Sequence, residues 1–151
     1  MIEIFIPGTP QGKGRARSAR LPNGKTIHYT PEKTRTYEGV IASLAMEAMG
    51  GRPPLEGPVG LTLIIEMPIP ASWPGWKREM AAAQKIAPTT KPDADNVEKA
   101  VKDGLNGIAW RDDCQVVSVV KDKLYGEVPG VGVIVYPKPR LPAQITKRPQ
   151  L

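Results

Sequence analysis

Two pairs of aspartates in one stretch of the chain have the residue type and spacing of a divalent-metal site. Asp93 and Asp95 stand where a helical pattern begins, and Asp112 and Asp113 stand where the chain next enters a strand. Magnesium takes oxygen ligands, often one or two carboxylates, and completes its shell with water and substrate phosphates. We expect Asp113 to meet Asp93 and Asp95 if the following strand packs beside the helix.

Lysine 99 follows Asp95 by four residues and therefore lies on the same face of the predicted helix, which Asp103 extends. Two interpretations stay open for Lys99. A surface ion pair would contribute only a few tenths of a kcal/mol. Beside a metal-bound phosphodiester, the same charge would stabilise the transition state of hydrolysis.

Three alternatives compete for the Asp-x-Asp pattern. Asp95 and Glu98 resemble a helix capping box, which accounts for one acid but not for both pairs. A calcium loop needs glycine at its sixth position, where this chain has Glu98, so that class is excluded. A phosphatase of the haloacid dehalogenase kind fits Asp93 to Val97, but its motif follows a buried strand and here a Pro/Thr-rich segment precedes.

The charge balance favours an acidic partner such as nucleic acid. The 151 residues include 21 Lys and Arg against 15 Asp and Glu, which gives a net charge of +6 and a pI near 9.6. Segment 8–30 is basic and glycine-rich, and it is either a phosphate-contacting loop or a solvated flexible arm. The cations predicted to contact DNA are Lys13, Arg15, Arg17, Arg20, Lys25 and Lys91.

The single cysteine and the single histidine exclude several classes of enzyme. Cys114 alone can form neither an internal disulfide nor a thiolate zinc site, and we expect it to be a small buried hydrophobe. His28 alone cannot supply the paired histidines of many nucleases and zinc hydrolases. Trp110 is predicted to pack in the core, whereas Trp73 and Trp76 have three open roles: packing, dimer contact or base stacking. If the protein is a hydrolase, its catalytic groups are therefore expected to be carboxylates and a metal ion.

The elements that must position these residues form one α+β domain with a mixed sheet flanked by helices. Apolar patterns predict strands at 2–7, 58–68, 115–121 and 131–137. Helices are predicted from Pro31 to Gly50 with Thr30 as the cap, from 77 to 86, and from 96 to 106. We expect the domain to span residues 1–137 and the Pro- and Lys/Arg-containing segment 138–151 to be an extended or mobile tail.

The motif itself resembles a known family. Lys-Pro-Asp-x-Asp-Asn-Val-x-Lys-Ala-Val-x-Asp-x-Leu-Asn-Gly, followed by Trp-x-Asp-Asp-x-Gln-Val-Val, is similar to the signature of the RusA family of Holliday junction resolvases, particularly its phage-borne members. The close match covers residues 89–120. The resemblance implies metal ligands at Asp93, Asp95 and Asp113, with Asp112 as a helper, and an essential Lys99. It also implies a dimeric RusA-like fold.

The same resemblance predicts a function. It implies a magnesium-dependent homodimer that places paired, symmetric nicks in four-way DNA junctions during recombination and repair, and whether manganese can replace magnesium stays open. The rival from another class is a branched-DNA-binding protein without catalysis. Against it, a binder gains nothing from acids that face phosphates. With no apolar run of about 18 residues, the sequence predicts a cytoplasmic protein without a membrane partner.

Overall fold

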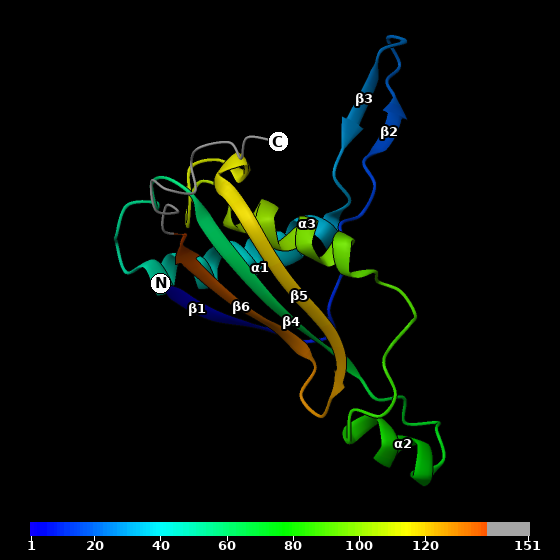
Figure 1. The fold of residues 1–151 in the computed structure, drawn as a ribbon. Helices are drawn as coiled ribbons and strands as arrows, with labels where there is room; N and C mark the ends of the chain where they lie inside the picture. The colour runs from blue at the N-terminus through cyan, green and yellow to red at the C-terminus, as the bar shows by residue number, and fades with distance from the viewer. Residues whose placement is uncertain (139–151) are drawn as a thin grey trace, which may run out of the picture.

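The computed structural model describes residues 1–138, and these form a mixed four-stranded sheet with helices on one face (Figure 1). The strands lie in the order β1 (Ile2–Pro7), β6 (Gly130–Pro137), β4 (Val59–Pro68) and β5 (Val116–Gly126). Only β4 and β5 run parallel, while β1 and β4 both pair antiparallel with β6. The predicted α+β class with a mixed sheet is confirmed.

The core lies between the sheet and two helices, α1 (Glu32–Met49) and α3 (Ala94–Leu105). Every second residue of β4 points to this side, and Leu61, Leu63 and Ile65 are completely buried. The two helices approach closely at Gly104, where an added Cβ would stand 2.7 Å from Cβ of Ile41. A side chain at position 104 would therefore push α3 away from α1.

The other face of the sheet carries a mixture of apolar and acidic side chains. Phe5, Ile64 and Val120 point to this side and are all exposed, as is the carboxylate of Asp122. Strand alternation places Glu66 on the same face. Helices α1 and α3 pack on the opposite side of the sheet.

The segment predicted as a loop at 8–30 contains a β-hairpin. Strands β2 (Arg17–Arg20) and β3 (Thr26–Tyr29) pair antiparallel, and the hairpin projects away from the sheet and the helices (Figure 1). Its tip turns at Gly24, which has a φ of +83°. The prediction was wrong because the two strands have only four residues each and bury almost nothing, so they leave little apolar pattern in the sequence.

Several element boundaries also differ from prediction. Helix α1 begins after Pro31 without a side-chain cap, so Thr30 does not cap it. Helix α2 spans Gly75–Ala82 rather than 77–86, and the left-handed residue Gln84 (φ 62°) follows its end. A short 3-10 helix, η1 (Asp113–Gln115), precedes β5, and β5 continues five residues past the predicted end at Lys121.

The predicted tail at 138–151 falls almost entirely outside the described residues. Only Lys138 is described, and its backbone N–H donates to the carbonyl of Pro58 at 2.8 Å. Within residues 1–138, no helix has the length and apolar character that crossing a membrane requires.

Candidate active site

The first acid pair stands at the N-terminal end of α3. Asp93 is the N-cap, and its Oδ1 accepts a hydrogen bond of 2.8 Å from the backbone N–H of Asn96. Helix α3 thus begins earlier than predicted, and Asp95 lies in its first turn with a side chain that is 79% exposed. The free N–H groups and the helix dipole favour negative charge at this end. The fold therefore holds two exposed carboxylates next to each other.

Lysine 121 contacts Asp95, and sequence reasoning missed it. Its ammonium forms an ion pair with Asp95 and a second one, of 2.9 Å, with Glu98. The hydrogen bond from Lys121 holds the pKa of Asp95 below its usual value, and the charge of Lys99 adds to this effect. The contacts with Asp95 and Glu98 raise the pKa of Lys121 in turn. A signal was present: Lys121 takes an inward position on a strand, where a charged residue requires a partner.

Glu98 lies between two lysines instead of closing the predicted capping box. Its carboxylate bonds to Lys121 at 2.9 Å and to Lys102 at 3.0 Å, and its side chain is only 17% exposed. Burial alone would raise the pKa of Glu98, but the two lysines outweigh burial and lower it. Glu98 is therefore ionised and fixes Lys121 beside Asp95.

Lysine 99 is exposed on α3, close enough to Asp95 for its charge to act there. None of the ion pairs within residues 1–138 includes it. Asp103, which the sequence placed on the same face, pairs instead with Lys13 at 2.7 Å. The ion-pair interpretation of Lys99 therefore has no support in the described contacts.

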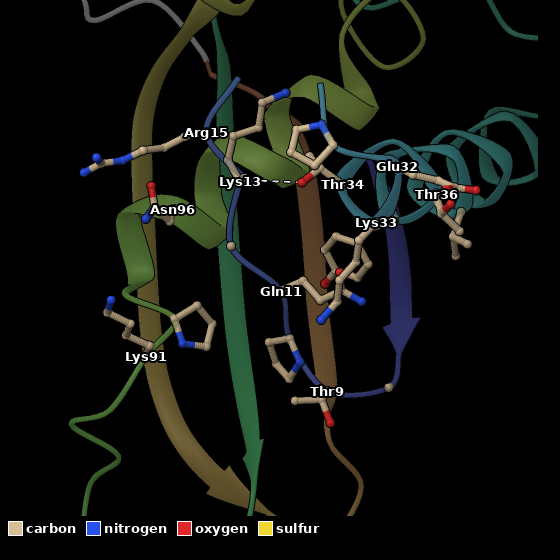
Figure 2. Close-up of a pocket in the computed structure, with 18 of the residues that line it drawn as sticks. Thr9, Gln11, Lys13, Arg15, Glu32, Lys33, Thr34, Thr36, Lys91 and Asn96 are labelled. Carbon is tan, nitrogen blue, oxygen red and sulfur yellow. Dashed lines mark hydrogen bonds between the residues drawn. The ribbon is translucent and has the colours of Figure 1, made fainter. Parts of the chain in front are cut away.

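A large open groove adjoins the first acid pair. It has a volume of about 1460 Å³, and its walls are segment 7–17, the start of α1 and the start of α3 (Figure 2). Asp93 and Asn96 line it at the α3 end. The cations that line it are Lys13, Arg15, Arg17, Lys33 and Lys91. The acids that line the groove are Asp93 of the first pair and Glu32 of α1, and its other charged side chains are cations.

The glycines of the groove wall serve close packing within the protein. A Cβ at Gly12 would stand 3.0 Å from Cβ of Asn96, and one at Gly14 would stand 2.5 Å from Oγ1 of Thr34. The Gly14 N–H donates to that hydroxyl at 3.1 Å, a contact that Figure 2 shows. The Lys13 N–H donates to the Asn96 carbonyl at 3.0 Å. The contacts of Gly12 and Lys13 attach the base of the hairpin to the acid-bearing end of α3, and the contact of Gly14 attaches it to α1.

The six predicted DNA-contacting cations divide into two kinds. Lys13 forms ion pairs with Glu38 at 2.5 Å and Asp103 at 2.7 Å. Burial would lower the pKa of Lys13, but the two carboxylates have the larger combined effect and raise it. The ammonium charge of Lys13 is therefore neutralised by partners within the protein. The other five are exposed and form no ion pair within residues 1–138: Arg15, Arg17, Arg20, Lys25 and Lys91.

The second acid pair is held in a local hydrogen-bond network. Asp112 caps η1 by accepting from the Cys114 N–H at 2.9 Å, and hydrogen bonds at Cys114 lower the pKa of Asp112. Gln115 completes a capping box with Asp112. Oδ1 of Asp113 accepts from Nε1 of Trp110 at 2.8 Å. Trp110 is completely buried as predicted, whereas Cys114 is exposed, so the prediction of a buried cysteine was wrong.

The two acid pairs lie near opposite ends of α3. This helix has 12 residues, which at 1.5 Å per residue gives about 18 Å. Strand β5 does pack beside α3, but it starts near the C-terminal end of α3 and meets Asp95 through Lys121, not Asp113. Within residues 1–138 of one chain, no three Asp, Glu, His or Cys side chains gather as a metal site.

The tryptophans of the α2 region differ from each other. Trp73 packs edge-on against Tyr125 with ring centroids 5.4 Å apart, and Lys77 lies 4.0 Å over its ring. Trp76 is 64% exposed. Packing therefore accounts for Trp73, and the role of Trp76 stays open.

The chain context contradicts the phosphatase alternative. That motif requires a buried strand directly before its first aspartate, but β4 ends at Pro68, and α2 and a segment without strand precede Asp93. Asp93 caps a helix instead of ending a strand.

Comparison with known proteins agrees with the motif. The family described as endodeoxyribonuclease RusA matches residues 7–136, which include both acid pairs, the groove and the hairpin. The chain is also 36% identical over 138 residues to the uncharacterized protein YqaN of Bacillus subtilis (strain 168), a match that covers 89% of this chain and 94% of the relative. The chain therefore belongs to the RusA endodeoxyribonuclease family.

Proposed function

We propose that this protein is a magnesium-dependent, structure-selective endodeoxyribonuclease that resolves four-way DNA junctions by paired, symmetric nicks in recombination and repair. One observation carries the proposal: the start of α3 holds two exposed carboxylates, of which Asp93 lines a groove with five cations and Asp95 follows two residues later. The cations suit a DNA backbone. The acids oppose binding of a phosphate unless a metal lies between them and the backbone.

The donor set at the start of α3 fits magnesium. Asp93 and Asp95 offer carboxylate oxygens, which this metal prefers, and their exposure leaves room for water and phosphate ligands. When bound, magnesium activates a water molecule and neutralises charge on the leaving oxygen. Lys121 pairs with Asp95 and would compete with a cation for that carboxylate.

Lys99 acts on the scissile phosphate in this proposal. It is exposed beside Asp95 and engaged in none of the ion pairs of the described residues, so its charge is available to a substrate. An ammonium group fixed where negative charge develops stabilises the transition state more than the ground state. The hairpin and Lys91 would hold the flanking backbone.

We further propose that the active unit is a homodimer. A four-way junction is nearly two-fold symmetric, and a two-fold dimer places identical sites on two opposed strands. Because Asp113 and its neighbour Asp112 lie about one helix length from Asp95, a metal role for Asp113 at the same site requires a second copy of the chain. Light scattering that shows only monomer at a concentration with full activity would contradict the dimer.

The decisive assay is cleavage of a synthetic four-way junction beside a linear duplex of the same arms. We expect paired nicks in the junction with Mg²⁺, little cleavage of the duplex, and none of either with EDTA. Parallel reactions with Mn²⁺ establish whether it substitutes. Tight junction binding without nicks under any metal would favour the non-catalytic binder instead.

A further inference from the structure

The β2–β3 hairpin has one apolar and one polar face. Register pairs Arg17 with Tyr29 and Ala19 with Ile27, and because neighbouring residues of a strand point to opposite sides, these four share a face. Beyond the strands, the Leu21 N–H donates to the Lys25 carbonyl at 2.7 Å, which places these two residues opposite each other. The apolar face therefore consists of Ala19, Leu21, Ile27 and Tyr29, and the polar face of Ser18, Arg20, Thr26 and His28.

The apolar face is open to solvent although it stands on a projecting arm. Ile27 is 43% exposed and Tyr29 is 45% exposed. On the polar face, Ser18 and His28 satisfy each other with a hydrogen bond of 2.9 Å. Figure 1 shows the hairpin extending beyond the sheet and helices, so the rest of the fold gives this apolar surface no support. Ile27 and Tyr29 are neighbours on one face of the same strand, so together they offer an apolar contact surface that the rest of the fold does not cover.

Charge indicates what the arm contacts. Between Glu3 and Glu32 the chain contains no acid and five cations. Lys13 pairs with Glu38 and Asp103, and the other four are exposed: Arg15, Arg17, Arg20 and Lys25. Arg17 and Lys25 stand at the two ends of the apolar face itself. Tyr29 lies opposite Arg17, and Ile27 lies between the Arg17 end and the Lys25 end, so an aromatic and an aliphatic side chain stand beside two cations. This arrangement matches a nucleobase with a phosphate on each side.

A continuous duplex does not offer that surface. Its bases stack on each other and present only their edges in the grooves, whereas a branch point interrupts stacking and exposes base faces. We propose that the β2–β3 hairpin enters the branch point and that Ile27 and Tyr29 pack against the base faces exposed there. The hairpin is then the element that distinguishes branched from linear DNA, and this role rests on the proposed function.

Geometry connects this contact to the acid pair. The base of the hairpin is fixed to α3 through the Lys13 N–H and the Asn96 carbonyl, at 3.0 Å, and through the close approach of Gly12 to Asn96. Asn96 follows Asp95 directly and also donates to Asp93. Docking of the hairpin at the branch point therefore fixes which phosphate lies over the carboxylates.

The test compares matched double variants of the two faces. Ile27→Thr with Tyr29→Thr removes the apolar surface while keeping strand-favouring residues, and Ser18→Thr with His28→Thr makes the same number of changes on the polar face. The readouts, taken without divalent metal, are affinity for a four-way junction, affinity for a linear duplex, and emission from 2-aminopurine beside the branch point. Tyr29→Phe keeps the ring and serves as the conservative variant.

We expect the apolar-face variant to lose preference for the junction on the order of tenfold, within the range for loss of a stacked base, with little change in duplex affinity. The wild type, the polar-face variant and Tyr29→Phe should change the 2-aminopurine emission, and the apolar-face variant should not. An unchanged preference and emission in the apolar-face variant would overturn the proposal, as would a shift in its oligomeric state, which would assign this face to a second copy.

Failure of the proposed function has a different signature. A wild type that binds junction and duplex equally and nicks neither with Mg²⁺ overturns both proposals together. A wild type that prefers and nicks the junction, with an apolar-face variant that behaves the same, overturns the hairpin contact alone. Thermal melts of all variants should coincide, because the hairpin lies outside the core.

Discussion

The two acid pairs have similar sequences and different surroundings. Asp93 and Asp95 are both exposed; Asp93 lines the basic groove, and Asp95 pairs with a lysine from another element, Lys121. Asp112 and Asp113 bond to their own neighbours in the chain, as a cap of η1 and as the acceptor of the Trp110 indole N–H. In the first pair, Asp95 can exchange its lysine partner for a metal ion. In the second pair, the hydrogen bonds of both aspartates stabilise the local fold.

Spacing along the sequence does not by itself separate a structural acid from a catalytic one. Acids near a helix end or a strand start have structural uses as caps, and both pairs contain one, Asp93 and Asp112. The four acids of the two pairs differ in where their partners come from, and only Asp95 has an ion-pair partner from a distant part of the chain. That partner, Lys121, lies 26 residues away.

The prediction with the largest expected effect concerns whether the two acid pairs of different chains form one site in a dimer. Asp93→Asn and Asp113→Asn chains are each expected to be inactive. If one site combines Asp93 of one copy with Asp113 of the other, mixed dimers contain one site with both acids intact, so mixing should restore part of the nicking. The measurement is junction cleavage after co-refolding of the two chains.

Recovery in the mixture, with none for either chain alone, is the expected result. A mixture that stays at background, with mixed dimers verified by mass spectrometry, would contradict a shared site.

A second comparison separates the structural and catalytic roles of Asp113. Asp113→Asn keeps an acceptor for the Trp110 N–H, whereas Asp113→Ala leaves that buried donor unpaired, at a cost of about 1–3 kcal/mol. We expect both variants to lose nicking and only Asp113→Ala to lose stability by this amount in urea unfolding. Normal nicking by Asp113→Asn would show that Asp113 has only a structural role.

The third prediction concerns Lys99. If it faces the scissile phosphate, Lys99→Ala should slow single-turnover nicking by on the order of 10²–10³. Junction binding should fall far less, because the hairpin cations carry most phosphate contacts. Stability should change by no more than about 0.5 kcal/mol, since the side chain is exposed. A variant that melts normally and cuts within a few-fold of wild type would rule out the catalytic role.

The smallest effect compares two lysines that share Glu98. Lys121→Ala and Lys102→Ala each remove one ion pair of Glu98, which is expected to cost about 0.2–1 kcal/mol. Only Lys121 also contacts Asp95, where it competes with a metal. We therefore expect Lys121→Ala alone to lower, several-fold, the Mg²⁺ concentration that gives half-maximal nicking. Equal metal titrations for the two variants would show that Lys121 does not compete.

Local patterns predicted the sheet strands and the long helices, because strong alternation or helical periodicity marks a buried face. Segment 8–30 was harder, since its strands bury little and their pairing depends on a turn at Gly24. The cap of α3 was assigned to Asp95 instead of Asp93, because both residue types suit that position and only the backbone decides.

The candidate site was predictable in its residue types but not in its assembly. The motif identified both acid pairs and Lys99, yet the distance between the pairs depends on the direction in which β5 runs past α3. Lys121 was missed because its role appears only when that strand is placed beside Asp95. Lys13 looked like a free cation, since its partners Glu38 and Asp103 come from two different helices.

Single-turnover cleavage of a four-way junction by Asp95→Asn in Mg²⁺ shows directly whether Asp95 acts in catalysis. We predict that nicking is lost while junction binding is unchanged or tighter, because the substitution removes both a metal ligand and repulsion from phosphate. Asp122→Asn, an exposed acid on the opposite face of β5, is the matched control and should cut like wild type. Near-wild-type cleavage by Asp95→Asn would show that Asp95 is not a catalytic residue.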